Sequence, residues 1–121
     1  MPVFLKILVA IIALEHLFIA YVEMFAWETK GPKMFSHLSL NFIKQTKQMA
    51  GNQGLYNLFL VAGMIWAICL TNPAWSFMIA IFFLACVAIA GIYGAITVEK
   101  SIFFKQAFPS LLVMILVFIF H

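Results

Sequence analysis

The chain has 121 residues, of which 66% are hydrophobic and 9% are charged, with a formal net charge of +3. A soluble domain is about 45–50% apolar and about 25% charged, so this composition excludes a soluble globular domain, a disordered tail and a nucleic-acid-binding module. The two cysteines, Cys69 and Cys86, are too few for a disulfide scaffold, and we interpret the chain as an integral membrane protein.

Long apolar segments follow one another along the chain, and a membrane-crossing helix needs about 20 residues. The apolar runs are continuous rather than alternating, which excludes a transmembrane barrel. The sequence therefore predicts an all-α polytopic membrane protein, with four transmembrane helices in an antiparallel bundle that forms a single domain over residues 1–121. The predicted helices span about residues 2–27, 39–71, 74–98 and 102–120.

The first segment has one other interpretation, a cleaved signal peptide with Lys6 at its basic start. Glu15 and His16 interrupt the apolar run where a small-residue cleavage site would follow, so we favour a retained helix.

The one long loop is predicted between Trp27 and about Leu38, where Gly31 and Pro32 break the chain. Ser39 is a good N-cap for the second helix. This helix is expected to stand out of the membrane for about two turns before it enters it. Farther along, Asn72 and Pro73 mark the turn between the second and third helices.

The lysines predict the orientation. The loops after the first and third helices are lysine-rich, whereas the opposite side has at most Lys6. Because basic loops stay in the cytoplasm, we expect a cytoplasmic-membrane protein with both termini outside. The cytoplasmic lysines are Lys30, Lys33, Lys44, Lys47, Lys100 and Lys105.

Polar residues within the first helix are the strongest candidates for a functional site. A charge at the bilayer centre costs on the order of 2.5–3.5 kcal/mol, so such residues face the bundle interior and find partners. His16, Glu23 and Trp27 share one helix face, and Glu15 lies on its flank. The alternative is that Glu15 and His16 serve packing alone.

The second and third helices add further candidates at a matching depth. We expect Asn52, Gln53, Tyr56, Asn57 and Tyr93 to line a ligand-binding site together with the polar residues of the first helix. Asn57 or Tyr56 is predicted to lie within hydrogen-bonding reach of His16 or Glu23. The alternative is that these amides only hold helices together, at about 0.6 kcal/mol each.

Small residues in the third helix allow another backbone to approach closely. The pairs Ala90/Gly94 and Gly91/Ala95 indicate either packing within the chain or a homodimer. No established metal-binding or catalytic motif occurs, so we assign no metal, cofactor or catalytic residue. Cys69 and Cys86 lie at different predicted depths, which argues against a disulfide.

Four motifs together resemble a known family. They are Leu14-Glu15-His16, the run from Glu23 to Thr29, the run from Asn52 to Asn57, and the run from Ala90 to Ala95. These motifs resemble a bacterial membrane family known as domain of unknown function 1304. The resemblance covers nearly the whole chain and implies four helices, but it implies no reaction, ligand or catalytic residue.

Three functions are consistent with this pattern. The preferred hypothesis is a small protein that binds or transports a small ligand, a proton or a cation at a polar site within the membrane. The second is a structural or accessory membrane protein. The third is a membrane-embedded enzyme in which Glu15 or Glu23 acts with His16 as acid and base.

Overall fold

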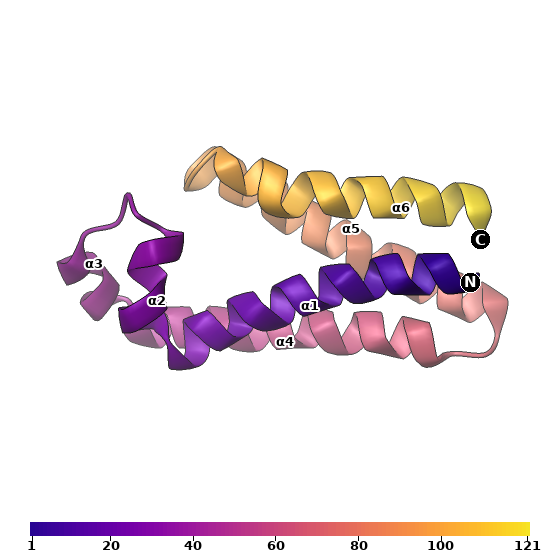
Figure 1. The fold of residues 1–121 in the computed structure, drawn as a ribbon, viewed down its shortest axis with the longest axis horizontal. Helices are drawn as coiled ribbons and strands as arrows, with labels where there is room; N and C mark the ends of the chain where they lie inside the picture. Colours follow the sequence, from indigo (N-terminus) through magenta and orange to yellow (C-terminus); the bar gives the residue numbers. More distant parts are fainter. The chain divides into compact units, whose positions relative to one another are not determined.

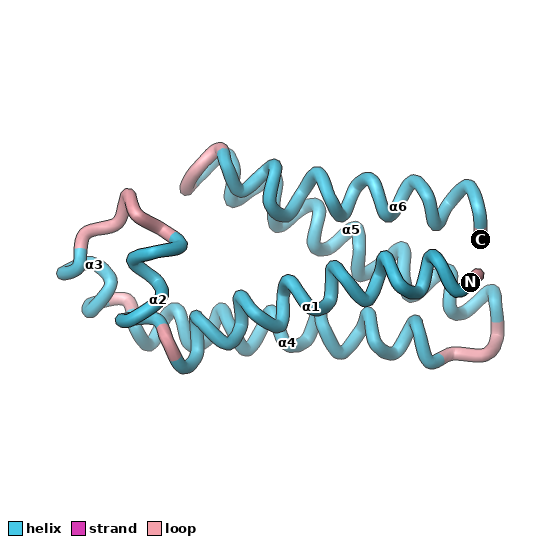
Figure 2. Tube along the Cα trace, viewed as in Figure 1, coloured by secondary structure: helices cyan, strands magenta, loops and turns pink.

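The computed structural model describes residues 1–121, and its regular structure is entirely helical (Figures 1 and 2). In chain order the helices are α1 (Val3–Phe25), α2 (Trp27–Met34), α3 (Leu40–Gln45), α4 (Lys47–Cys69), α5 (Pro73–Thr97), the π-helix η1 (Phe103–Ala107) and α6 (Phe108–Phe120). Four segments are long and apolar enough to cross a membrane, namely α1, α4, α5 and the combined segment Phe103–Phe120. The all-α class with four such helices is confirmed, whereas their antiparallel order stays a prediction.

The chain divides into two compact units. The terminal unit comprises Met1–Ala13 and Ala62–His121, and the central unit comprises Leu14–Val61. Helices α1 and α4 therefore each contribute residues to both units.

In the terminal unit, small residues and serines join the helices. A Cβ atom on Gly91 would lie 2.6 Å from the backbone nitrogen of Ala107, so α5 and η1 are in backbone contact. The Ser110 hydroxyl donates a hydrogen bond of 2.6 Å to the Leu84 carbonyl, and it is fully buried. Gly91 thus makes a close contact within the chain, as the packing interpretation of the small-residue pairs requires.

The turn between α4 and α5 is built as the sequence predicts. The Asn72 side chain caps α5 by accepting a hydrogen bond from the Trp75 backbone N–H at 3.1 Å, and Pro73 occupies the first turn. The Ser76 hydroxyl donates to the Ala67 carbonyl at 2.7 Å and ties the two helices together after the turn. Cys69 and Cys86 are both free, in agreement with the predicted absence of a disulfide.

The π-helix η1 runs directly into α6, just before Pro109. Proline has no N–H, so Pro109 cannot donate to the Lys105 carbonyl four residues earlier. At the end of η1 the Phe108 N–H bonds to the Phe103 carbonyl, five residues earlier, in the wider π pattern. A π turn here accommodates a proline that a regular α-helix would tolerate poorly.

In the central unit, a helix replaces the loop predicted between Trp27 and Leu38. Helix α2 forms because the Trp27 ring packs over Gly31, where a Cβ atom would lie only 3.0 Å from the ring. The Gly31 carbonyl then accepts a hydrogen bond of 2.8 Å from the Phe35 N–H at the end of the helix. Gly31, which indicated a break, therefore serves packing against the tryptophan, and Pro32 lies inside the helix.

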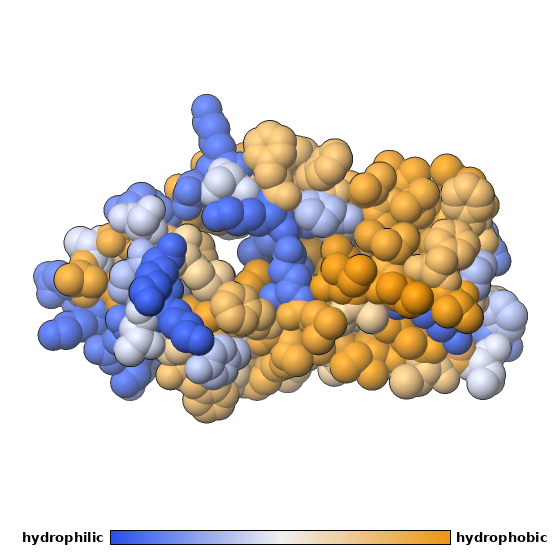
Figure 3. Space-filling model, in the orientation of Figure 1, coloured by the Kyte–Doolittle hydropathy of each residue, from blue (hydrophilic) through white to orange (hydrophobic).

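The second predicted helix is also interrupted, at Thr46. Ser39 caps its start as predicted, accepting a hydrogen bond from the Phe42 N–H at 3.1 Å. The Thr46 hydroxyl donates to the Phe42 carbonyl at 2.8 Å, a side-chain bond that bends helices, and α4 begins one residue later. We call residues 27–46, which include α2 and α3, the cap; hydrophilic residues gather over it in Figure 3.

Candidate functional site

A buried acid and an amide meet between α1 and α4 in the central unit. Glu23, in the last turns of α1, is 4% exposed. The Asn57 side-chain N–H donates a hydrogen bond of 2.6 Å to Glu23 Oε1. The predicted contact between Glu23 and the amide-rich stretch is therefore present, with Asn57 rather than Tyr56 as the partner.

Gly54 explains why the two side chains meet. A Cβ atom at this position would lie 2.5 Å from Met24 Cγ and 3.0 Å from the Ala20 carbonyl oxygen, so α4 touches α1 here without an intervening side chain. Asn57 lies three residues farther along α4 and hence on a neighbouring part of the same face. The glycine contact thus brings the amide within reach of the carboxyl group.

Trp27, a predicted site residue, is buried and acts as the centre of the cap. Its indole N–H donates to Thr46 Oγ1 at 3.2 Å, and its ring lies 5.7 Å from the Phe35 ring. Val22, Ile43 and Ala50 complete the buried cluster around it. These contacts join the end of α1 to the start of α4, close in sequence to the Glu23–Asn57 pair.

Glu15 and His16 approach one another from adjacent positions on α1. His16 Nδ1 lies 3.8 Å from Glu15 Oε1, and the His16 side chain is buried. Glu15 is 37% exposed as a side chain, yet its Oε1 atom is buried and makes no hydrogen bond. A carboxyl oxygen and an imidazole nitrogen are therefore held close together, and they form an ion pair when His16 is protonated.

Three other predicted site residues of the central unit do not contact Glu23. Tyr56, Asn52 and Gln53 are exposed. The reason is rotation about α4: Gly54 faces α1, and at about 100° per residue both Asn52 and Tyr56 lie about 160° away from it. Tyr93 belongs to the terminal unit and is also exposed.

Residues outside the predicted set complete the central unit. Thr46 binds Trp27, and Lys47 Nζ lies 3.1 Å from Glu28 Oε1. The sequence contains one usable signal for the ion pair, since Glu28 is the only acid between residues 24 and 98. No periodicity indicated Thr46, because its partner is 19 positions away.

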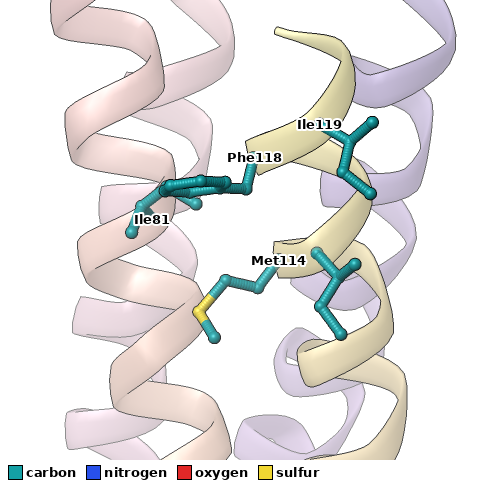
Figure 4. A pocket seen from close by; sticks show the side chains of 5 residues that line it. Ile81, Met114, Phe118 and Ile119 are labelled. Atoms are coloured by element: carbon teal, nitrogen blue, oxygen red, sulfur yellow. The ribbon is translucent and has the colours of Figure 1, made fainter.

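Two observations concern other kinds of site. No group of three or more histidine, cysteine, aspartate or glutamate side chains is arranged to hold a metal ion. A hollow of about 320 Å³ lies between α5 and α6, lined by Ile81, Met114, Ile115, Phe118 and Ile119 (Figure 4). This lining is apolar and differs in kind from the polar site that the sequence predicts.

An all-α chain with four helices apolar enough to cross a membrane is compatible with a polytopic membrane protein. The chain belongs to the family described as protein of unknown function (DUF1304), whose profile matches residues 10–118. It is similar to an uncharacterized protein, YpaA, from Lactococcus lactis, with 27% identity over 117 residues, which cover 95% of this chain and 97% of the relative. A comparison with solved structures finds no significant match.

Proposed function

We propose that this chain is a four-span protein of the bacterial cytoplasmic membrane that binds and exchanges a proton or a small cation at Glu23. The observation that carries this proposal is the hydrogen bond of 2.6 Å from Asn57 to a glutamate that is 4% exposed. Acidic residues within membrane segments are costly and commonly mark ion pathways. The Asn57 amide supports a charged carboxylate by donating to it, and carboxylate and amide oxygens both suit small cations.

Glu15 and His16 extend the proposed site along α1. His16 and Glu23 are seven residues apart, which is close to two helical turns, so they share a face. Glu15 and His16, with His16 Nδ1 3.8 Å from Glu15 Oε1, add two further proton-binding groups on the same helix. Asn52, Gln53, Tyr56 and Tyr93 are exposed and are left out of the proposed site.

The proposal also assigns an orientation, with the cap in the cytoplasm and both termini outside. Its support is the lysine distribution. Lys33 is exposed, so a Lys33→Cys variant in a Cys69→Ser, Cys86→Ser background tests the assignment. An impermeant maleimide should label it in inside-out vesicles only, and labelling in intact cells would contradict the orientation.

Charge movement tests the proton- and cation-binding role. The full chain is reconstituted into vesicles on a solid-supported membrane, and the current is recorded after a pH jump and after a Na⁺ jump. We expect a transient current to one of these jumps in the wild type and its loss in Glu23→Gln. Glu28→Gln, which removes an acid of the cap outside the four candidate spans, is the matched control and should keep the current.

A structural role is the second candidate, and the Gly54 contact favours it. Gly54 and the Asn57–Glu23 bond together form a close, satisfied junction between α1 and α4. A junction of this kind needs no ligand, because interhelical hydrogen bonds stabilise membrane helix pairs by themselves. Equal currents in the wild type and Glu23→Gln would favour this candidate and contradict the ion-binding proposal.

A further inference from the structure

The cap has an excess of positive charge. It carries three lysines and a single acid, Glu28, and Lys47 follows as the first residue of α4. Lys47 Nζ lies 3.1 Å from Glu28 Oε1, so this acid is already paired. The remaining positive charges of the cap belong to Lys30, Lys33 and Lys44, which are all exposed.

These lysines are held on a structured surface. Beneath them, Trp27 and Ile43 are buried in one cluster, against which Met34, Phe35 and Leu38 pack. Trp27 and Gly31 are the buried residues of α2, so Lys33 lies on its other side and Lys30 lies on the flank of the buried face. Lys30 Nζ also lies 5.1 Å from the centre of the Tyr21 ring, a cation–π distance.

Large apolar side chains are exposed beside the lysines. On α3, Leu40 is 69% exposed and Phe42 is 45% exposed. Ile43, the next residue, is buried. Lys44 follows Leu40 by one turn and therefore shares its side of the helix. Figure 3 shows hydrophobic residues interspersed with the hydrophilic ones over the cap.

This combination matches the surface of an anionic membrane. Interfacial helices place apolar side chains among the acyl chains and lysines at the headgroups. Juxtamembrane lysines are attracted to anionic lipids by about 1 kcal/mol each, which is about fivefold in affinity. All the basic residues are lysines, which contact phosphates as point charges rather than through the bidentate geometry of arginine.

We propose that the cap is a docking surface for anionic phospholipid headgroups. Lys30, Lys33 and Lys44 contact the lipid phosphates, while Leu40 and Phe42 insert at the boundary of the acyl chains. This inference rests on the membrane placement in the proposed function, but it does not depend on ion binding at Glu23. The apolar residues favour a lipid surface over an acidic protein segment, because they need an apolar medium beside the charges.

Native mass spectrometry of the full chain in a neutral detergent tests this proposal. Palmitoyl-oleoyl-phosphatidylglycerol or phosphatidylcholine with the same acyl chains is titrated into the sample, and bound lipids are counted. The wild type should prefer phosphatidylglycerol, and K30Q/K33Q/K44Q should lose about fivefold of that preference for each lysine removed. The control Lys6→Gln removes a lysine that the proposed orientation puts on the opposite side of the membrane, and it should keep the preference.

Two further variants serve as controls for misfolding and for the ion-binding proposal. K30R/K33R/K44R preserves the charge and should bind phosphatidylglycerol as the wild type does, and this comparison separates charge loss from misfolding. Glu23→Gln should also keep the lipid preference, so failure of the ion-binding proposal leaves this one standing. Equal affinity of the wild type for both lipids, or a loss in Lys6→Gln as large as that in K30Q/K33Q/K44Q, would overturn the docking surface.

Discussion

In the central unit some polar side chains bind one another as well as the backbone, whereas Ser76 and Ser110 of the terminal unit bind backbone carbonyls. Asn57 donates to Glu23, Trp27 donates to Thr46, and an ion pair lies on the surface. In the terminal unit, Ser76 and Ser110 donate to backbone carbonyls of neighbouring helices. Glycine contacts between helices occur in both units, at Gly54 and at Gly91.

The two kinds of contact differ in whether they contain a titratable group. A hydroxyl that donates to a helix carbonyl adds stability but leaves no titratable group in the contact. A carboxyl group bound by an amide costs more to bury and can change its charge. Because both units pack through glycine but only the central unit buries an acid, the candidate site belongs to the central unit.

The largest effect is expected from Gly91→Ala in the terminal unit. The new Cβ atom would lie 2.6 Å from the Ala107 nitrogen, and backbone atoms cannot move aside as a side chain can. We expect a loss of about 1–3 kcal/mol, measured as a lower melting temperature in detergent. Gly51→Ala is the control: it has no neighbour within 4 Å and should be neutral or stabilising. Equal melting temperatures for the two variants would contradict the close contact.

A double-mutant cycle of Glu23→Leu and Asn57→Leu measures the central pair. Hydrogen bonds between membrane helices average about 0.6 kcal/mol and reach about 1.7 kcal/mol. We expect a coupling energy near the upper value, because the bond is 2.6 Å long and Glu23 is buried. The free energy of unfolding in mixed micelles, followed by circular dichroism, gives the four values. Strict additivity of the two single losses would show that the side chains do not interact.

Ser110→Ala tests the corresponding bond in the terminal unit and should have a smaller effect. It removes one neutral hydrogen bond to the Leu84 carbonyl, for an expected loss of about 0.6 kcal/mol. Ser101→Ala is the matched control, because the Ser101 hydroxyl is buried without a hydrogen-bond partner and its removal should not destabilise the chain. The comparison of the two units fails if Ser110→Ala costs more than the Glu23–Asn57 coupling.

The smallest effect is expected from Glu28→Gln. Its partner Lys47 lies at 3.1 Å, but both side chains are well exposed, so the ion pair is screened by water and salt. The change in the free energy of unfolding should stay within about 0.5 kcal/mol and should shrink further in high salt. A larger loss of unfolding free energy that does not depend on salt would contradict this expectation, because it would mean that the ion pair stabilises the cap.

The helical class and most helix boundaries could be predicted from the amino-acid sequence alone. In a chain of this composition, continuous apolar runs of sufficient length form long helices. Local chemistry also predicted the Ser39 and Asn72 caps, since each depends on a donor only three residues away. The four short motifs were enough to indicate the family to which the chain belongs.

Which polar residues contact one another depends on the tertiary packing of the helices. Asn52, Gln53, Tyr56 and Asn57 are neighbours in sequence, but a helix contact admits one face, and Gly54 selects the face that carries Asn57. Helix α2 and the break at Thr46 were not predictable for the same reason. The Trp27 ring packs over Gly31 in α2 and donates to Thr46 at the break, and its position is set by a buried cluster and by a hydrogen bond that spans 19 residues.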